Sequence, residues 1–286
     1  MVVLAVLHPD GPRLADPDVP LLRADDVGVL RGESVFETLR IAAGQPAFVG
    51  AHLDRLAVSA RRLAMALPDG WEQLVGLAVA TWAQTDGVLR LVLTKGGVAY
   101  ALVTPVPAGN AALRASGLRA VSLPWGVPAG LRATAPWLLG GVKSTSYATN
   151  MAAQRHAQEL GVDDAVLVSS DGEVLEGPTS SAAWVRDGTL VTPPAEVGIL
   201  PGLTMAVVLE LCAELGFAAE VRRTSVEELA GADEVLLAGS VRGVVPVVEL
   251  DGRPLAVGPV TAALRDAFEE RLTQSGGAVG PVVAPR

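Results

Sequence analysis

Apolar residues return along this chain at two different spacings, and the spacings predict both strands and helices. The segment 34–41 alternates like a strand, and its side chains fall on two faces: Phe36, Thr38 and Arg40 on one, Val35, Glu37 and Leu39 on the other. From Ala51 to Leu67, apolar residues recur every three or four positions, which predicts an amphipathic helix. The first part of the chain therefore combines strands with helices.

Turn residues divide the rest of the chain into further elements. An Asp-Gly pair between two β-prone runs is a strong hairpin signal, and three occur: Asp171-Gly172, Asp187-Gly188 and Asp251-Gly252. Ser225 with Glu228 three residues later fits the cap of a helix. Strands are also expected at 1–8, 88–94, 100–106 and 234–238, and helices at 71–84, 145–160, 204–215, 225–229 and 259–272.

The order of these elements lacks the regular strand–helix repeat of a doubly wound sheet, so we expect an α+β or mixed α/β fold. Gly/Pro-rich stretches at 105–110 and 124–130 bracket a connection between two unequal domains. The predicted organisation is a smaller N-terminal α/β domain at 1–118 and a larger, cofactor-binding C-terminal domain at 119–273. Residues 274–286 are expected to form a flexible tail.

Composition and charge narrow the classes of function. The 286 residues are 50% hydrophobic, and the net charge of -9 argues against nucleic acid or an anionic membrane as partner. No apolar run is long enough to span a membrane, and the start lacks a basic signal-peptide region, so we expect a cytoplasmic protein. Cys212 is the single cysteine and has the setting of a helix core position. The three histidines show no metal-ligand spacing.

Lys143 and Glu176 are the first candidates for chemistry. A lysine that forms a Schiff base with an aldehyde, and a carboxylate that keeps a pyridine nitrogen protonated, are what pyridoxal 5'-phosphate needs from a protein. A lysine in a Gly/Ser-rich loop is more often a solvated surface residue, so both interpretations stay open on this pair alone. A nucleotide-binding P-loop is disfavoured, because the glycines that this motif places before its lysine are missing.

Three further segments could bind an anion. Arg55 lies beside the apolar stripe of its helix, one turn from His52, and needs an anionic partner, either a phosphate or a carboxylate. Thr204 is expected to cap a helix whose N-terminus favours a phosphate, although an ordinary capped helix is the simpler explanation. Ser240 lies in a small-residue turn after the strand 234–238 and could also contact an anion.

Taken together, the motifs of this chain resemble those of a known family, the fold-type IV pyridoxal-phosphate enzymes or class IV aminotransferases. The resemblance rests on the order of six motifs: Arg31–Arg40, His52–Leu56, Lys143–Tyr147, Leu175–Gly177, Thr192–Pro194 and Gly198–Thr204. It covers about residues 20–270. Three segments look most similar to the 4-amino-4-deoxychorismate lyase branch: Leu21–Asp26, Pro136–Leu139 and Lys143–Met151.

The resemblance implies the two-domain architecture of D-amino-acid aminotransferase and pyridoxal 5'-phosphate as cofactor. Lys143 would form the Schiff base and then carry the proton, Glu176 would pair with the pyridine nitrogen, and Tyr147 would lie near the phenolic oxygen. Arg55 would bind the phosphate, helped by Leu203, Thr204 and Ser240. The family's active site lies between the domains and near a dimer interface, so a homodimer is implied as well.

On the substrate side, the resemblance implies that a small amino substrate is lined by Phe36, Thr38 and Arg40. Thr38 is also the candidate catalytic hydroxyl, acting as a general acid on the leaving oxygen. The turn Thr94–Ala99 is short and lacks the Arg/His-bearing loop with which D-amino-acid aminotransferases hold the substrate carboxylate. The longer Gly/Arg-rich loop of some lyases is missing too.

We therefore expect a lyase that converts 4-amino-4-deoxychorismate to 4-aminobenzoate and pyruvate for folate biosynthesis. The alternative is a class IV aminotransferase that acts on branched-chain or D-amino acids with a 2-oxo acid acceptor. A catalytically silent homologue with a binding or structural role is disfavoured, because Lys143, Glu176 and Arg55 are all present.

Overall fold

The computed structural model describes residues 1–274, and their contacts divide the chain into two compact units. The first unit contains Met1–Pro107 and also the short segment Val142–Tyr147. The second contains Ala108–Gly141 and Ala148–Glu270. The expected flexible tail at 274–286 lies outside the described residues, except for Gln274, the last residue of a helix.

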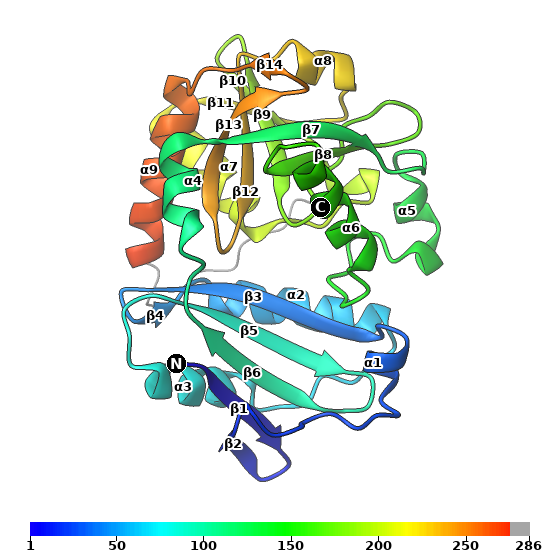
Figure 1. The fold of residues 1–286 in the computed structure, drawn as a ribbon, viewed down its shortest axis with the longest axis vertical. Helices are drawn as coiled ribbons and strands as arrows, with labels where there is room; N and C mark the ends of the chain where they lie inside the picture. The colour runs from blue at the N-terminus through cyan, green and yellow to red at the C-terminus, as the bar shows by residue number, and fades with distance from the viewer. Residues whose placement is uncertain (275–286) are drawn as a thin grey trace. The chain divides into compact units, whose positions relative to one another are not determined.

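An antiparallel sheet with the strand order β2-β1-β6-β5-β3-β4 forms the centre of the first unit (Figure 1). Three helices accompany it. In chain order the elements are β1 (Val3–His8), β2 (Gly11–Ala15), α1 (Val27–Leu30), β3 (Ser34–Ala42), β4 (Gln45–Pro46), α2 (Val49–Arg62), α3 (Trp71–Trp82), β5 (Gly87–Thr94) and β6 (Ala99–Thr104).

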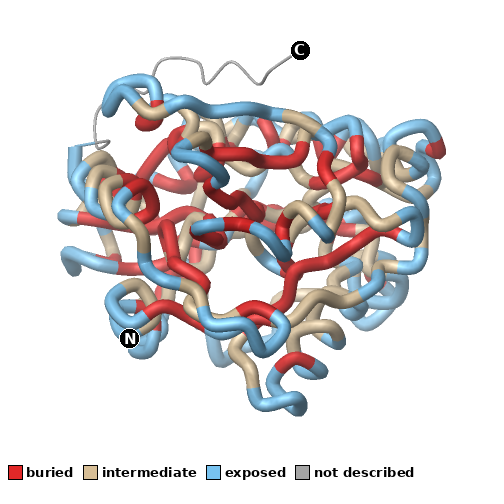
Figure 2. The backbone as a smooth tube through the Cα atoms, turned by 90° about the horizontal axis from the view of Figure 1, so that it is seen from above, coloured by how far each residue is buried: buried red, intermediate tan, exposed pale blue. Residues whose placement is uncertain are grey.

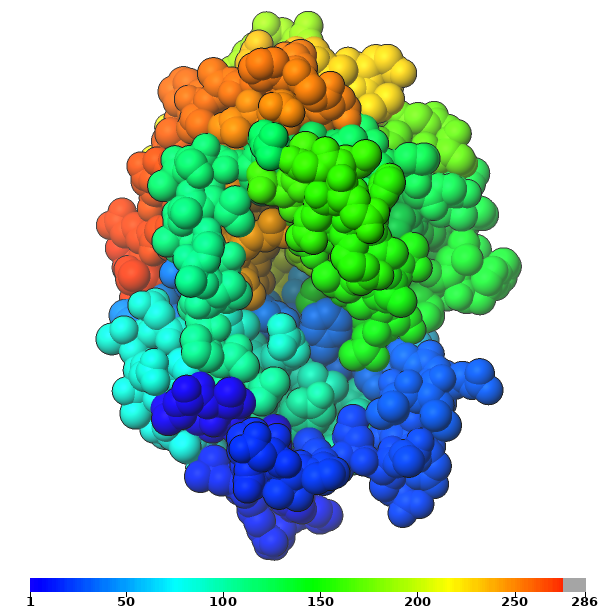
Figure 3. Space-filling view, in the orientation of Figure 1, coloured from blue at the N-terminus to red at the C-terminus, as the bar shows by residue number. Residues whose placement is uncertain are grey.

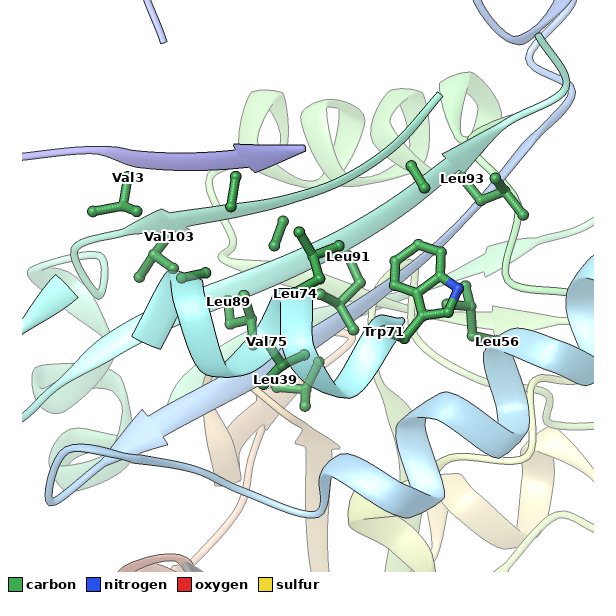
Figure 4. Close-up of a cluster of buried hydrophobic side chains, with 14 of the residues drawn as sticks. Val3, Leu39, Leu56, Trp71, Leu74, Val75, Leu89, Leu91, Leu93 and Val103 are labelled. Carbon is green, nitrogen blue, oxygen red and sulfur yellow. The ribbon is translucent and has the colours of Figure 1, made fainter. Parts of the chain in front are cut away.

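The core of the first unit lies between this sheet and two helices, with α2 packed on β3 and α3 packed on β1 and β6. Helix α3 buries one stripe at helical spacing: Trp71, Leu74, Val75, Ala78 and Trp82. Figure 4 shows the side chains of α3 interleaved with leucines from β3 and β5. The inward positions of β3 are fully buried, as the alternating pattern of that segment predicts.

The second unit is built on a mixed sheet with the order β11-β10-β9-β12-β13-β7-β8, and β14 pairs with β13. The pairs β10–β11, β13–β7 and β7–β8 are parallel. Its elements are α4 (Gly109–Ser116), β7 (Leu118–Pro124), α5 (Leu131–Thr134), η1 (Pro136–Leu138), α6 (Ala148–Glu159), β8 (Asp164–Val168), β9 (Ser181–Arg186), β10 (Thr189–Thr192), η2 (Ala195–Val197), α7 (Leu203–Leu215), β11 (Ala218–Val221), α8 (Val226–Ala230), β12 (Glu234–Gly239), β13 (Gly243–Leu250), β14 (Arg253–Pro254) and α9 (Pro259–Gln274).

Buried positions in both units follow the central strands, whereas most turns are exposed (Figure 2). In the second unit, β9 and β12 are buried on both faces, which explains their nearly continuous apolar sequence. Helices α4 and α9 lie side by side (Figure 3), joined by an ion pair of 3.5 Å between Arg114 and Glu269. None of the described helices is long and apolar enough to cross a membrane.

Two of the three hairpins predicted from Asp-Gly pairs are confirmed. Asp187-Gly188 and Asp251-Gly252 join antiparallel strands, and all four residues have positive φ angles, the geometry that favours this pair in a tight hairpin. Asp171-Gly172 also forms a turn, but it is flanked by an isolated bridge between Val168 and Val174 instead of two full strands.

The expected strands and helices are confirmed, with ends shifted by a few residues. Ser225 caps α8 as predicted, because its side chain accepts the amide N–H of Glu228. Cys212 is fully buried in α7, which confirms it as a core position, and burial raises the pKa of its thiol to about 11.

Candidate functional site

Strand β3 and helix α2 bury a charged cluster inside the first unit. Glu37 lies on the inward face of β3 and is fully buried. Its carboxylate accepts two hydrogen bonds from Arg55, from Nε at 2.8 Å and Nη2 at 2.7 Å. His52 Nδ1 lies 2.7 Å from the same carboxylate. A bidentate Arg–carboxylate pair is a strong form of charged hydrogen bond, and here it fixes the arginine in place.

The ionisation of this cluster follows from its partners. Burial alone would raise the pKa of Glu37, but the charge and hydrogen bonds of Arg55, with a hydrogen bond from His52, lower it from 4.5 to about 2. Burial lowers the pKa of His52, so its imidazole is neutral at pH 7. A carboxylate can only accept, so Nδ1 carries the proton that binds Glu37.

Lys143 lies in Val142–Tyr147, the short segment that belongs to the first unit although the residues before and after it belong to the second. Its carbonyl accepts the N–H of Phe36 at 3.1 Å, and the N–H of Thr145 binds the carbonyl of Ser34 at 2.8 Å. The N–H of Lys143 binds the hydroxyl of Ser59 at 3.2 Å. The backbone at Lys143 is therefore held by both β3 and α2.

The Lys143 side chain is half-buried against aromatic rings. Its Nζ lies 4.6 Å from the centre of the Phe36 ring and 5.9 Å from that of Tyr147. The two rings meet edge to face, with centres 5.4 Å apart. The alternative of a solvated surface lysine does not describe this position, because the amine packs on ring faces.

Thr38 and Arg40 share a face of β3 with Phe36, as predicted. Thr38 is partly exposed, and Arg40 is buried with an ion pair of 3.9 Å to Asp86. Six of the proposed site residues thus belong to the first unit: Phe36, Thr38, Arg40, Arg55, Lys143 and Tyr147. Among these, the structure brings Lys143, Phe36 and Tyr147 into direct contact.

Glu176 lies in the second unit, at the end of the turn that follows β8. One carboxylate oxygen, Oε2, accepts the N–H of Leu200 at 3.2 Å. The other, Oε1, lies 3.8 Å from Nη1 of Arg132. The carboxylate is mostly buried, with its side chain 14% exposed, and each of its two oxygens has a partner in the second unit.

The start of α7 lies close to the loop that follows Glu176. Gly202 is the N-cap of this helix, so the prediction that Thr204 caps it is wrong. Thr204 is instead the second helical residue and is buried. A Cβ on Gly202 would lie 2.2 Å from the Ser181 hydroxyl, so the helix can approach this closely only because residue 202 is glycine. The amides of Leu203 and Thr204 precede the first helical hydrogen bond and form the end that attracts anions.

Ser240 lies in the turn between β12 and β13. The neighbouring Arg242 donates to the Thr179 hydroxyl at 2.9 Å and pairs with the fully buried Asp164 at 2.6 Å. These contacts hold the Ser240 turn beside the loop that follows Glu176. The remaining four proposed site residues, Glu176, Leu203, Thr204 and Ser240, therefore lie on connected segments of the second unit.

Sequence reasoning missed three side chains that support these groups. Ser59 lies four residues after Arg55 and seven after His52, so a polar stripe at helical spacing could have revealed it. Glu37 was assigned to the face of β3 opposite Phe36, but no sequence signal pairs it with Arg55. Arg132 carries no motif and is found only through its contact with Glu176.

The residues present fit pyridoxal phosphate by their chemistry. The first unit offers an amine on aromatic rings and a fixed guanidinium, and the second offers a carboxylate with a helix N-terminus. Lys143, Arg55, Glu176 and the start of α7 are thus the groups that could hold an aldehyde, a phosphate and a pyridine nitrogen.

Comparison with known proteins agrees with this chemistry. The family model of amino-transferase class IV matches residues 34–250. The chain is 37% identical to the bifunctional aminodeoxychorismate lyase / D-amino acid transaminase of Mycobacterium tuberculosis, covering 83% of this chain and 89% of that protein. It is 30% identical to a putative branched-chain-amino-acid aminotransferase of Methanocaldococcus jannaschii, covering 86% and 89%. The PLP-bound structure of a hypothetical aminotransferase from M. tuberculosis superposes with a TM-score of 0.88 at 35% identity, covering 95% of this chain and 99% of that one.

Proposed function

This chain belongs to the class IV aminotransferase family, and from that premise we propose that it is a 4-amino-4-deoxychorismate lyase. It is a pyridoxal-phosphate-dependent enzyme with the fold-type IV architecture. The proposed reaction converts the substrate to 4-aminobenzoate and pyruvate. The name of the relative from M. tuberculosis, which includes this lyase activity, supports the choice.

The observation that carries the pyridoxal-phosphate chemistry of this proposal is the position of Lys143. The chain has two lysines, Lys95 and Lys143, so few amines can bind an aldehyde. Lys95 forms an ion pair of 3.6 Å with Glu33 and hydrogen bonds to the carbonyl of Leu63. Lys143 instead lies against Phe36 and Tyr147, in the unit that also fixes Arg55.

When bound, pyridoxal phosphate supplies an electron sink for the electron pair left by a broken C–H bond. Lys143 Nζ takes the proton from the carbon that bears the substrate's amino group. The C–O bond to the neighbouring enolpyruvyl group then breaks, the ring becomes aromatic, and the released enolpyruvate takes up a proton to give pyruvate. No oxidant, reductant or water is consumed.

Other side chains of the site bind and orient. In the first unit Arg55, fixed by Glu37, would bind the phosphate, and in the second unit the amides at the start of α7 and the Ser240 turn would do so. Glu176 holds the proton on the pyridine nitrogen, and Phe36 and Tyr147 keep the Lys143 amine directed and shielded from water. Thr38 donates a proton to the leaving oxygen, a role that its place beside Phe36 on β3 motivates.

The first test is product analysis with enzymatically generated 4-amino-4-deoxychorismate and cofactor-loaded protein. 4-Aminobenzoate is followed by chromatography and pyruvate by a coupled lactate dehydrogenase assay. Lys143→Ala should abolish both products. Lys95→Ala is the matched control and should keep the wild-type rate, because that side chain is held elsewhere.

A second readout locates the covalent bond itself. Borohydride reduction of the loaded protein followed by peptide mass spectrometry should place the cofactor on the peptide that contains Lys143. Formation of 4-aminobenzoate by Lys143→Ala at the wild-type rate, or labelling of Lys95, would overturn the assignment.

Aminotransferase activity is the second candidate function. It is supported by the name of the same relative, which joins the lyase to a D-amino acid transaminase, and by the branched-chain relative from M. jannaschii. If no 4-aminobenzoate forms, branched-chain and D-amino acids are screened. Conversion of the cofactor to its amine form by one of them would support this function. We further propose a cytoplasmic location and a homodimer, and size-exclusion chromatography with light scattering checks the dimer.

A further inference from the structure

The guanidinium of Arg132 lies beside the carboxylate that the proposed function assigns to the pyridine nitrogen. Its Nη1 is 3.8 Å from Oε1 of Glu176, while Oε2 accepts the N–H of Leu200 at 3.2 Å. Each carboxylate oxygen therefore has its own partner in the second unit. Both side chains are largely buried, with 22% of Arg132 and 14% of Glu176 exposed.

The chain at position 132 packs closely against two glycines. A Cβ on Gly140 would lie 2.5 Å from the Arg132 carbonyl oxygen, and a Cβ on Gly198 would lie 2.5 Å from the Arg132 Cβ. Both distances are far shorter than real contacts, so glycine at 140 and 198 is what lets the chain approach the carbonyl oxygen and Cβ of Arg132 this closely. The guanidinium carbon also lies 5.7 Å from the centre of the Trp125 ring, which limits its movement.

The charge of Arg132 acts on the carboxylate that it approaches. A nearby cation favours the ionised form of a carboxyl group, and the effect weakens with distance. The pyridine nitrogen of a bound cofactor would be one hydrogen bond further from Arg132 than the carboxylate is. The charge of Arg132 therefore acts on that nitrogen less strongly. Arg132 therefore lowers the basicity of the Glu176 carboxylate more than it lowers the basicity of the ring nitrogen. The proton that the two groups share moves toward the nitrogen.

We propose that Arg132 is a positioning residue that holds Glu176 ionised and directed, so that the proton stays on the pyridine nitrogen of the cofactor. The proposal rests on the proposed function only in the role of Glu176. It does not depend on whether the enzyme is a lyase or an aminotransferase, because both reactions need the protonated ring.

The test is 15N NMR of the protein loaded with pyridoxal phosphate labelled at the ring nitrogen, whose chemical shift distinguishes the protonated from the neutral form. In Arg132→Met, which keeps an unbranched side chain, the ratio of protonated to neutral nitrogen should fall about tenfold, the effect of one pKa unit. Arg132→Lys keeps the charge, so its ratio of protonated to neutral nitrogen should be close to that of the wild type. Arg155→Met, an exposed arginine on α6, is the matched control and should leave the signal unchanged.

The variants separate failure of this inference from failure of the proposed site. Both variants are measured between pH 6 and pH 9. If Glu176→Gln changes the nitrogen signal but Arg132→Met does not, the role of Arg132 is overturned and that of Glu176 stands. If Glu176→Gln leaves the signal unchanged, the role of Glu176 falls and this inference falls with it. Circular dichroism and cofactor content show whether each variant is folded, and Arg132→Gln replaces the methionine variant if that one does not fold.

In steady-state kinetics, Arg132→Met should lower kcat about tenfold while KM changes less than about twofold, because the charge acts on the chemical step and not on substrate binding. A rise in KM with unchanged kcat would assign Arg132 to substrate binding and overturn the proposal.

Discussion

The buried pair of Glu37 and Arg55 should make a large, pH-dependent contribution to the stability of the first unit. Glu37→Gln keeps the shape of the side chain and removes its charge. The pKa of Glu37 falls from 4.5 to about 2 on folding, and about 2.5 units at 1.36 kcal/mol each correspond to about 3 kcal/mol at pH 7. Removing one partner of a buried ion pair costs about 3–5 kcal/mol, which agrees in size.

The sign of the pH dependence follows from the lowered pKa. The stabilisation by the Glu37 carboxylate is complete above pH 4.5 and is lost as the pH falls through 2, because the unfolded chain then binds the proton more readily. More than half should be gone by pH 3. The free-energy difference between wild type and Glu37→Gln should therefore be nearly the same at pH 7 and pH 5 and less than half as large at pH 3.

Urea unfolding at pH 7, 5 and 3, followed by far-UV circular dichroism, measures this difference. Glu33→Gln is the matched control, since Glu33 precedes the same strand but forms a partly exposed ion pair of 3.6 Å with Lys95, worth about 0–1 kcal/mol. A difference between wild type and Glu37→Gln below about 1 kcal/mol at pH 7, or one that is equal at pH 7 and pH 3, would refute the reasoning.

Three other outcomes follow from buried groups. Arg242→Met should destabilise the protein by about 3–5 kcal/mol in urea unfolding, because it leaves the buried Asp164 carboxylate without its ion pair, and a loss below about 1 kcal/mol contradicts this. Trp82→Ala should cost about 3–5 kcal/mol by opening a cavity in the core of the first unit, and near-wild-type stability argues against the packing described. The thiol of Cys212, with its pKa raised to about 11, should not react with Ellman's reagent at pH 7.5 in the native protein but should react fully in guanidinium, so rapid native reaction is the contrary result.

Most of the elements could be predicted because their signals are local. Alternation placed β3, helical spacing placed α2 and α3, and Asp-Gly pairs placed two hairpins. The assignment of Thr204 as an N-cap failed by two residues, since a glycine in extended conformation can take that position without a capping side chain.

The roles of the candidate site were harder to derive, because they depend on contacts between distant parts of the chain. The need of Arg55 for an anionic partner was readable from the sequence, but the choice between phosphate and carboxylate was not. The structure supplies Glu37 as one partner, 18 positions away in sequence. Likewise, nothing local in the sequence joins Arg132 to Glu176.

The sequence by itself determined the local elements and the chemical inventory: two lysines, one cysteine, an alternating strand and a motif order that resembles one family. Only the tertiary structure decided that Val142–Tyr147 belongs to the first unit, that Ser59 and β3 hold the backbone of Lys143, and that two glycines make room for Arg132. The reason is physical. Backbone preferences and side-chain periodicity act over a few residues, whereas the partner of a buried charge is set by which distant segments the whole chain can pack together.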